Sequence, residues 1–367
     1  MLTFLFYILV IILVIVTLFF IKMATIPKSN SIIRTKVFKG KFEDVWSIVA
    51  DLKEYSRWNP WQILENVDAP EGYTEGVPTK SNMEYSTETN TVGGYQKWNS
   101  RVLGKGELHI KSIEKDNNQG TIISELLFYM NRKSNKKTSS ESIITIEKLE
   151  GGYVRATWQL NWSLPLFIRF MHKPMSELLS IDYDRGLDNI SHIAGDTSNP
   201  YSLSFLGIRQ TPRTQYIGMK FKGSNEALEH SKATIINSLN KEVEAQNLKV
   251  QGHSSFIIFK KINIWKRSVS TIICVPVETL PSTLPKKFVK GVYNPSNSLV
   301  VKLTGSHEHR YKAWSYATAL AKGNEAYKPA KAILCEPPCE VVLKGMDDTN
   351  HAKEYETLIV INMKKRG

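Results

Sequence analysis

Three side chains in the first half of the chain are of the types that move protons. Glu107 and His109 alternate with apolar neighbours in a strand-like stretch, and Tyr129 lies in the next such stretch. A carboxylate, an imidazole and a phenol can act as general acid or base when they face a bound substrate. We therefore keep these three as candidate catalytic residues, although polar residues alternating along a strand also commonly face solvent.

A second set of side chains suits binding of an apolar molecule. If the stretch from Val154 to Trp162 is a strand, Trp158, Leu160 and Trp162 share one of its faces. Core packing explains any one of the rings, but together they favour the aromatic wall of a cavity. The candidate lining residues of this first cavity are Trp58, Trp61, Trp98, Tyr129, Trp158 and Trp162.

Motifs of the common catalytic and nucleotide-binding sites are absent from the sequence. It contains no G-x-S-x-G elbow, Walker loop, dinucleotide fingerprint or H-E-x-x-H. His307 and His309 are expected to be surface residues at a helix start, and we predict no metal site and no cofactor. The three cysteines do not suggest a disulfide framework. Cys274 is expected in a core, and a redox or metal role for Cys335 and Cys339 stays open.

The first element that must position the candidate residues is a helix. Apolar residues from Val45 to Leu52 recur at i, i+3, i+4 and i+7, which predicts one buried helical face. The helix is expected to end by Asn59, because Pro60 disfavours helical geometry in the residue before it. The loop that follows, as far as Trp61, is rich in aromatic rings and needs a body on which to pack.

This stretch resembles the start of START-like, polyketide-cyclase/dehydrase-type domains of the SRPBCC superfamily, in which a first helix leads to a D-x-x-x-Y-x-x-W-x-P-W loop. Three later segments agree in order: Lys97 to Ile110, Val154 to Trp162, and Met175 to Ile193 with its D-Y-x-x-G-L-x-N signature. The resemblance implies a helix-grip fold over residues 31–195. It leaves activity open, because such domains include both enzymes and binding proteins.

The second half of the chain shows a degenerate repeat of β-α-β-β order. The first copy is predicted from Thr214 to Val277, with a helix from Asn225 to Asn247. The second copy follows Pro285, with a strand from Leu299 to Thr304 and a helix from His307 to Lys322. Such a duplication suggests two halves that share a groove along a pseudo-two-fold axis.

This half resembles the gyrase-inhibitor-like, AraC-type effector-binding domain. The resemblance implies a groove for small, often cationic or lipophilic molecules. A carboxylate commonly follows the Thr of the last strand in that family, but Leu358 stands there, and Glu356 is the alternative acid. The expected lining residues are Tyr216, Trp265, Tyr311, Trp314, Tyr355 and Glu356.

Residues 2–21 contain no charge and are long enough to cross a bilayer. No basic n-region or cleavage site is evident, so an uncleaved anchor is expected. Basic residues follow the span and none precedes it, which predicts that the remainder is cytoplasmic. They are Lys22, Lys28, Arg34, Lys36, Lys39 and Lys41.

The formal net charge of +13 is compatible with an anionic partner, but the basic residues are spread along the chain. The densest cluster is expected in a solvated hairpin loop, with lipid headgroup contact as the alternative. It comprises Arg132, Lys133, Lys136 and Lys137.

We therefore expect an α+β protein in five parts: a transmembrane helix at 1–22, a linker at 23–30, a START-like domain at 31–195, a linker at 196–204 and an effector-binding domain at 205–367. The leading hypothesis is a membrane-anchored protein that binds or senses an apolar or lipid-like molecule. The alternative is a START-like cyclase or hydrolase acting on an apolar substrate. DNA-linked regulation is disfavoured, no nucleic-acid partner is expected, and the oligomeric state stays open.

Overall fold

The computed structural model describes residues 2–65, 67, 83–100, 102–129, 136–198, 200–252, 255–263, 268–324, 326–330, 336–345 and 348–366. The chain divides into two compact units, each described here by itself. The first comprises Met1–Pro60, Asn82–Asn99 and Gly104–Asp196, and the second comprises Trp61–Ser81, Ser100–Leu103 and Thr197–Gly367. The second unit thus includes two short segments that precede its C-terminal part in the sequence.

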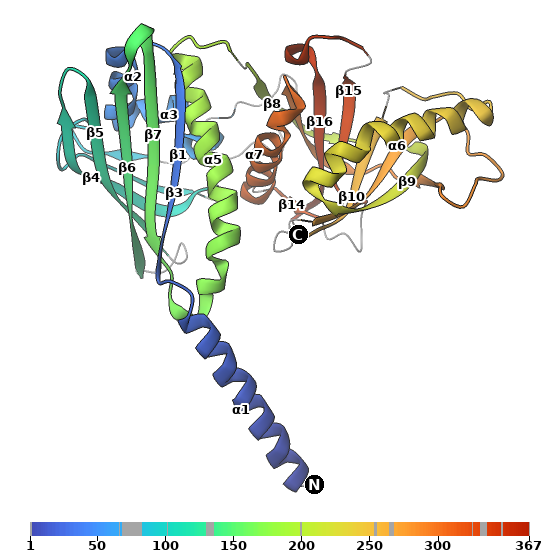
Figure 1. The fold of residues 1–367 in the computed structure, drawn as a ribbon, viewed down its shortest axis with the longest axis horizontal. Helices are drawn as coiled ribbons and strands as arrows, with labels where there is room; N and C mark the ends of the chain where they lie inside the picture. Colours follow the sequence, from blue (N-terminus) through green and yellow to red (C-terminus); the bar gives the residue numbers. More distant parts are fainter. Residues whose placement is uncertain are drawn as a thin grey trace. The chain divides into compact units, whose positions relative to one another are not determined.

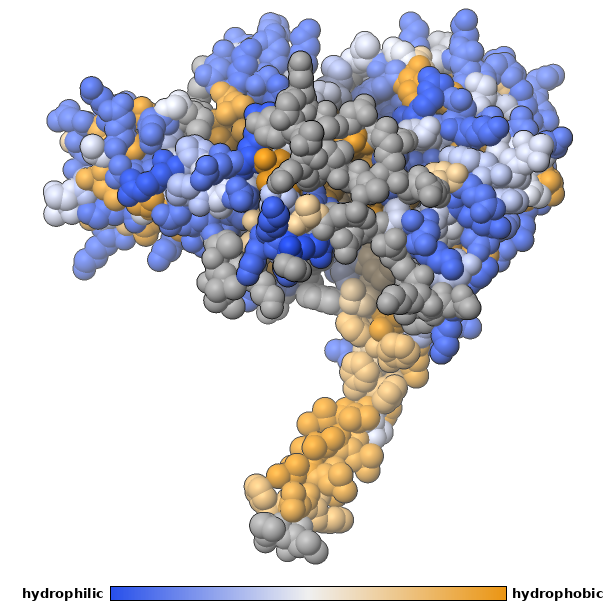
Figure 2. Space-filling model, turned by 180° about the vertical axis from the view of Figure 1, so that it is seen from behind, coloured by the Kyte–Doolittle hydropathy of each residue, from blue (hydrophilic) through white to orange (hydrophobic). Residues whose placement is uncertain are grey.

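Helix α1 (Leu2–Ala24) is apolar on every side along most of its length (Figures 1 and 2). Its 23 residues rise about 1.5 Å each, enough to cross a hydrocarbon core of about 30 Å. Within the described part of the chain it is the one helix that is long and apolar enough to do so. A membrane anchor and a signal sequence share this pattern.

The first unit is built on a seven-stranded sheet in the order β1-β7-β6-β5-β4-β3-β2. Burial alternates along its strands, as in β7, where residues from Val154 to Trp162 are buried at every second position. The first and last long strands, β1 and β7, pair over eleven residues. The strands are β1 (Ser29–Lys39), β2 (Glu84–Tyr85), β3 (Tyr95–Ser100), β4 (Gly104–Lys115), β5 (Gln119–Tyr129), β6 (Lys137–Lys148) and β7 (Tyr153–Ser163).

Helix α5 (His172–Ile193) runs along the sheet of the first unit (Figure 1). Two ion pairs join it to β1: Arg34 Nη2 lies 2.5 Å from Asp184 Oδ2, and Lys36 Nζ lies 2.7 Å from Asp188 Oδ1. In the same part of α5, Tyr183, Leu187 and Ile190 are buried. The other helices and 3-10 turns of this unit are α2 (Phe42–Ala50), η1 (Leu52–Glu54), α3 (Tyr55–Trp58), η2 (Glu150–Gly152) and η3 (Leu166–Met171).

The expected end of the first helical region at Asn59 is confirmed. Asn59 is extended, with ψ of 120°, directly before Pro60. The expected aromatic loop is instead a chain of short helices, because α4 (Pro60–Glu65) begins at Pro60, whose fixed φ suits a first helical turn.

The second unit contains a larger antiparallel sheet in the order β12-β9-β11-β10-β15-β16-β13-β8, with β14 paired to β16. The two triplets β9-β11-β10 and β13-β16-β15 mirror each other across the β10–β15 pair. The strands are β8 (Ser202–Gln210), β9 (Thr214–Ser224), β10 (Ser255–Asn263), β11 (Ser268–Val277), β12 (Val289–Tyr293), β13 (Asn297–Thr304), β14 (Tyr327–Pro329), β15 (Cys339–Lys344) and β16 (Glu356–Lys365).

Helices α6 (Asn225–Ala245) and α7 (Arg310–Gly323) cover one face of this sheet, and the 3-10 turn η4 (His307–His309) leads into α7. Trp314 of α7 packs against the hydrophobic clusters under both helices. The opposite face holds its own cluster, around Phe256 and Cys274. The 3-10 turn η5 (Ala352–Glu354) precedes the last strand.

The expected α+β class is therefore confirmed, as two large antiparallel sheets with helices and one apolar N-terminal helix.

Candidate functional site

The aromatic rings of Trp58, Trp158 and Tyr183 pack against one another inside the first unit. The ring centres of Trp58 and Trp158 are 5.1 Å apart, and those of Trp158 and Tyr183 are 4.0 Å apart. Trp58 Nε1 donates to the Ile48 carbonyl at 2.9 Å, and Trp158 Nε1 donates to Ser142 Oγ at 3.0 Å. Because these donors are used within the protein, Trp58 and Trp158 form packed core here.

The D-Y-x-x-G-L-x-N segment of α5 makes close contacts with this aromatic core. A Cβ atom on Gly186 would lie 2.6 Å from the Trp158 ring, so a side chain there would displace the indole. Asn189 Nδ2 donates to the Trp58 carbonyl at 2.9 Å, and Arg185 Nη2 donates to the Pro60 carbonyl at 2.9 Å. This segment of α5 therefore holds the end of α3 and the following Pro60 in place.

Trp162 and His172 are different, because their polar atoms are buried without hydrogen bonds. Their side chains come from the end of β7 and the start of α5, and the ring centres are 6.0 Å apart. Trp162 is 6% exposed and His172 is 7% exposed. Trp162 Nε1 and both ring nitrogens of His172 have no hydrogen-bond partner among the described residues. Such atoms cost about 1–3 kcal/mol each when they stay unpaired.

Trp98 on β3 also has a buried indole nitrogen without a hydrogen-bond partner in the described residues. Its ring lies over Gly106, where a Cβ atom would be 2.3 Å away. Trp98 borders an open pocket of about 190 Å³ whose other lining residues are Glu84, Lys97, Asn99, Lys105, Gly106 and Glu107. Trp61 is partly exposed in α4 and belongs to the second unit.

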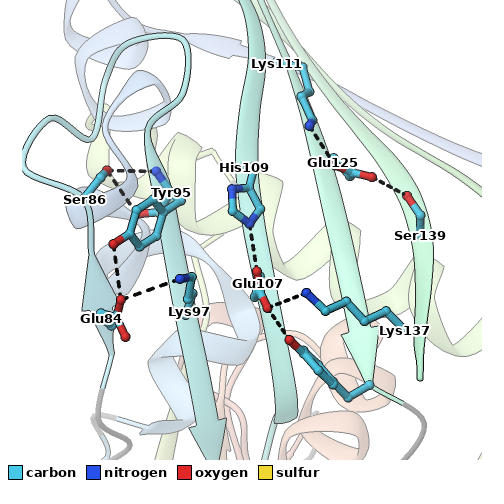
Figure 3. Close-up of polar contacts among 11 residues, drawn as sticks. Glu84, Ser86, Tyr95, Lys97, Glu107, His109, Lys111, Glu125, Lys137 and Ser139 are labelled. Carbon is cyan, nitrogen blue, oxygen red and sulfur yellow. Dashed lines mark hydrogen bonds and ion pairs between the residues drawn. The ribbon is translucent and has the colours of Figure 1, made fainter. Parts of the chain in front are cut away.

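Glu107 and His109 lie next to each other on β4 (Figure 3), on the face opposite the buried Leu108, and Tyr129 of β5 contacts Glu107. Tyr129 donates to Glu107 Oε1 in a short hydrogen bond, and Lys137 Nζ lies 2.9 Å from the same oxygen. His109 Nε2 lies 3.0 Å from Glu107 Oε2. Leu108, between Glu107 and His109 on β4, faces the core. Glu107 and His109 thus lie away from the core, the alternative that alternation along a strand left beside a catalytic role.

Burial by itself would raise the pKa of the Glu107 carboxyl, but hydrogen bonds from Tyr129, His109 and Lys137 outweigh it. Together they lower the pKa from 4.5 to about 2. A carboxylate this acidic is a weak proton acceptor near neutral pH, since a general base works best when its pKa is near the working pH. The geometry therefore favours a structural ion cluster at Glu107.

Replacing Glu107 by glutamine is expected to reduce stability by about 1 kcal/mol near neutral pH, because the cluster lies near the surface and water screens it. The folded-state pKa is below the unfolded one, so the contribution is complete above pH 4.5 and is lost as the pH falls towards about 2. Urea unfolding of the wild type and Glu107→Gln across this range measures the difference. A constant difference at every pH would contradict the assignment.

In the second unit, the centre of the helix-covered face carries a buried charge cluster. Glu340 of β15 is 2% exposed and Arg310 of α7 is 3% exposed, and Arg310 Nη1 lies 3.8 Å from Glu340 Oε2. Trp314 Nε1 donates to Glu340 Oε1 at 2.5 Å. Arg310 also forms a short ion pair with Glu229 of α6. The neighbouring carboxylates raise the pKa of Arg310, although its burial opposes this.

The residues predicted to line the second groove do not converge on one face. Trp314 lies on the helix-covered face, whereas Tyr216 packs in the cluster on the opposite face. Glu356 pairs with Lys302 at 3.2 Å. Tyr355 is 8% exposed, and Tyr311 is 37% exposed and lies beside Arg310. Trp265 lies outside the described residues, as do Arg132, Lys133 and Cys335.

The histidines at the start of α7 are less exposed than predicted. His309 is 5% exposed and stacks on Tyr201 with ring centres 4.1 Å apart. His307 stacks on Tyr355 at 5.0 Å, and its burial lowers its pKa. The expectation of two surface histidines is wrong for His309, because the tertiary fold places an aromatic ring over it. Cys274 is buried in a core, as predicted.

Sequence reasoning missed Glu340, Arg310 and His172. A charged residue inside the apolar run Cys339–Leu343 was a usable signal for Glu340. Arg310 gave no such signal, because it stands among other polar residues at a helix start. His172 was passed over because its partner Trp162 is ten residues away and on another element.

No protein-family model matches the chain, and no curated protein matches it. Several solved structures are similar at a distance. EcmrR in a DNA complex is 14% identical, with 54% of this chain and 70% of that chain covered and a TM-score of 0.39. The EcmrR C-terminal domain is 13% identical, with 46% and 100% covered and a TM-score of 0.38.

A norcoclaurine synthase point mutant of Thalictrum flavumn, in complex with a transition-state analogue, is 12% identical. It covers 45% of this chain and 94% of its own, with a TM-score of 0.30. Similarity at this level does not transfer an activity to the present chain.

Proposed function

We propose that this chain is a membrane-anchored protein that binds an apolar or amphiphilic small molecule in its first unit. The observation that carries the proposal is the buried Trp162–His172 pair with its unpaired polar atoms. An indole N–H only donates, and a neutral imidazole both donates and accepts. The pair therefore suits a hydroxyl or carboxyl head group attached to an apolar body.

The anchor part of the proposal rests on contacts between α1 and the folded unit. Met23 is 3% exposed, and Arg169 Nη1 donates to the Ile26 carbonyl at 3.2 Å. A segment removed by a signal peptidase would have no reason to pack its last turn into the mature domain. We infer a retained anchor, with both units on the cytoplasmic side because basic residues follow the span.

We assign the first unit to the START-like helix-grip class, and the second to a duplicated effector-binding domain. The packing of α5 along β1 and β7 of the antiparallel sheet supports the first assignment, and the mirrored strand order of the second sheet supports the other. Arg310 already neutralises the buried Glu340. A neutral or lipophilic ligand therefore fits the second unit better than a cation.

The test is ligand retention by the full chain purified in mild detergent. Organic extraction with mass spectrometry is expected to find an amphiphile bound to the wild type. Trp162→Phe keeps the ring and removes the donor, and His172→Leu removes both ring nitrogens. Each lost hydrogen bond is worth about 1–1.5 kcal/mol, so the affinity for the ligand should fall about five- to tenfold for each bond removed, and more for His172→Leu if both ring nitrogens bind.

The matched control is Trp46→Phe, which alters another buried tryptophan of the same unit, packed on Gly120. It should retain the ligand as the wild type does. Absence of any amphiphile from the wild type, or equal loss in the Trp46→Phe control, would count against the proposed site.

A further inference from the structure

The surface beside the end of α1 combines exposed aromatic rings with positive charge. Phe167 and Phe170 of η3 are 54% and 39% exposed. Lys173 is exposed two residues after η3, and Lys22 and Lys28 are exposed at and just after the end of α1, which contacts η3. We call these five residues the juxtamembrane face.

Contacts within the first unit fix this face at the end of the apolar helix. α1 contacts η3, and the buried Met23 belongs to its last turn (Figure 1). The chain is held at the same place by the Arg169–Ile26 hydrogen bond and by Leu164 N–H donating to the Lys28 carbonyl at 3.0 Å. When α1 spans the bilayer, η3 therefore lies at the depth of the lipid headgroups.

The charge of the face is not balanced by acidic residues from the same segments. No Asp or Glu occurs in residues 22–42 or in residues 163–176. Aromatic rings favour the membrane interface, and lysines near a bilayer are attracted to anionic headgroups. We propose that the juxtamembrane face docks on an anionic lipid surface and holds the first unit against the bilayer.

Docking would have a consequence for the proposed ligand site. His172 lies between Met171 of η3 and Lys173 of the face, so this surface adjoins the Trp162–His172 pair. If the Trp162–His172 pair binds an amphiphile, as proposed above, the ligand would have only a short distance to pass between the membrane and its site. The docking itself does not depend on any ligand, so the two ideas can fail separately.

The test places a fluorophore at Phe170→Cys in the full chain, reconstituted in nanodiscs that contain doxyl-labelled lipid. The matched control is Tyr153→Cys, an exposed ring at the other end of the same β7 strand. Ser163 and Tyr153 are ten residues apart on β7, about 33 Å in an extended strand. Labelling of the wild type in parallel measures the background from native cysteines, and circular dichroism checks folding.

Quenching at position 170 is expected to exceed that at position 153 at least about threefold. It should increase when phosphatidylglycerol replaces part of the phosphatidylcholine, and decrease at high salt. Lys28→Glu with Lys173→Glu should weaken this lipid dependence, whereas Lys148→Glu, an exposed lysine near the far end of the sheet, should not.

Equal quenching at the two positions would overturn the proposal. Quenching that is identical in neutral and anionic lipid, and unaffected by the charge reversals, would overturn its electrostatic part. Cross-linking of Phe170→Cys between two copies without lipid quenching would assign the face to self-association instead.

Discussion

Replacing Arg310 by methionine is expected to destabilise the second unit by about 3–5 kcal/mol, because it leaves buried carboxylate charge uncompensated. Glu340 is 2% exposed and, within the described part of the chain, would keep the Trp314 hydrogen bond but lose its cationic partner. Methionine fills much of the space of the arginine stem. The loss of stability should therefore come mainly from the missing positive charge and less from a cavity. Calorimetry on the full chain can measure the lower transition temperature of the second unit, since each unit is expected to unfold in its own transition.

The double variant Arg310→Met with Glu340→Gln separates charge from packing. Glutamine retains an oxygen that can accept from Trp314, and the buried charge is removed, so much of the stability should return. Arg209→Met, at an exposed strand end, is the control and should change stability little. An equally large loss in the double variant would show that Arg310 acts mainly through packing.

Replacing Trp158 by alanine is expected to cost the first unit about 3–5 kcal/mol, the range for removing a large buried ring. Trp158 is 3% exposed and packs between Trp58 and Tyr183, so its neighbours cannot readily collapse into the space. Trp158→Phe should cost less, because a ring remains and the main loss is the hydrogen bond to Ser142. Chemical unfolding of the three proteins measures the order.

Gly186 offers an internal control for this prediction. In the wild type, Gly186→Ala places a Cβ atom 2.6 Å from the Trp158 ring and should destabilise by about 1–3 kcal/mol. In the Trp158→Ala background the clash with the ring is gone and only the contact with Pro60 Cδ at 3.1 Å remains, while alanine favours the helix, so the same substitution should cost much less. An equal loss of stability in both backgrounds would refute contact with the Trp158 ring as the reason for this glycine.

Local pattern determined the elements of this protein well. The apolar span, a helix with a buried face around Val45 to Val49 and the extended Asn59 are all legible in the sequence. These features depend on neighbours a few residues apart, through helical periodicity, strand alternation and the restriction that proline places on the residue before it. Alternation also grouped Glu107 with His109 correctly.

Only the tertiary structure decided which side chains face each other. Trp58 and Trp61 are three residues apart, yet one closes the core of the first unit and the other belongs to the second. The same holds for Trp162 with His172 and for Arg310 with Glu340, which meet because separate elements pack together. Whether a buried polar atom finds a hydrogen-bond partner depends on the residues around it in the folded protein. Those residues come from distant parts of the chain, so local sequence patterns do not reveal them.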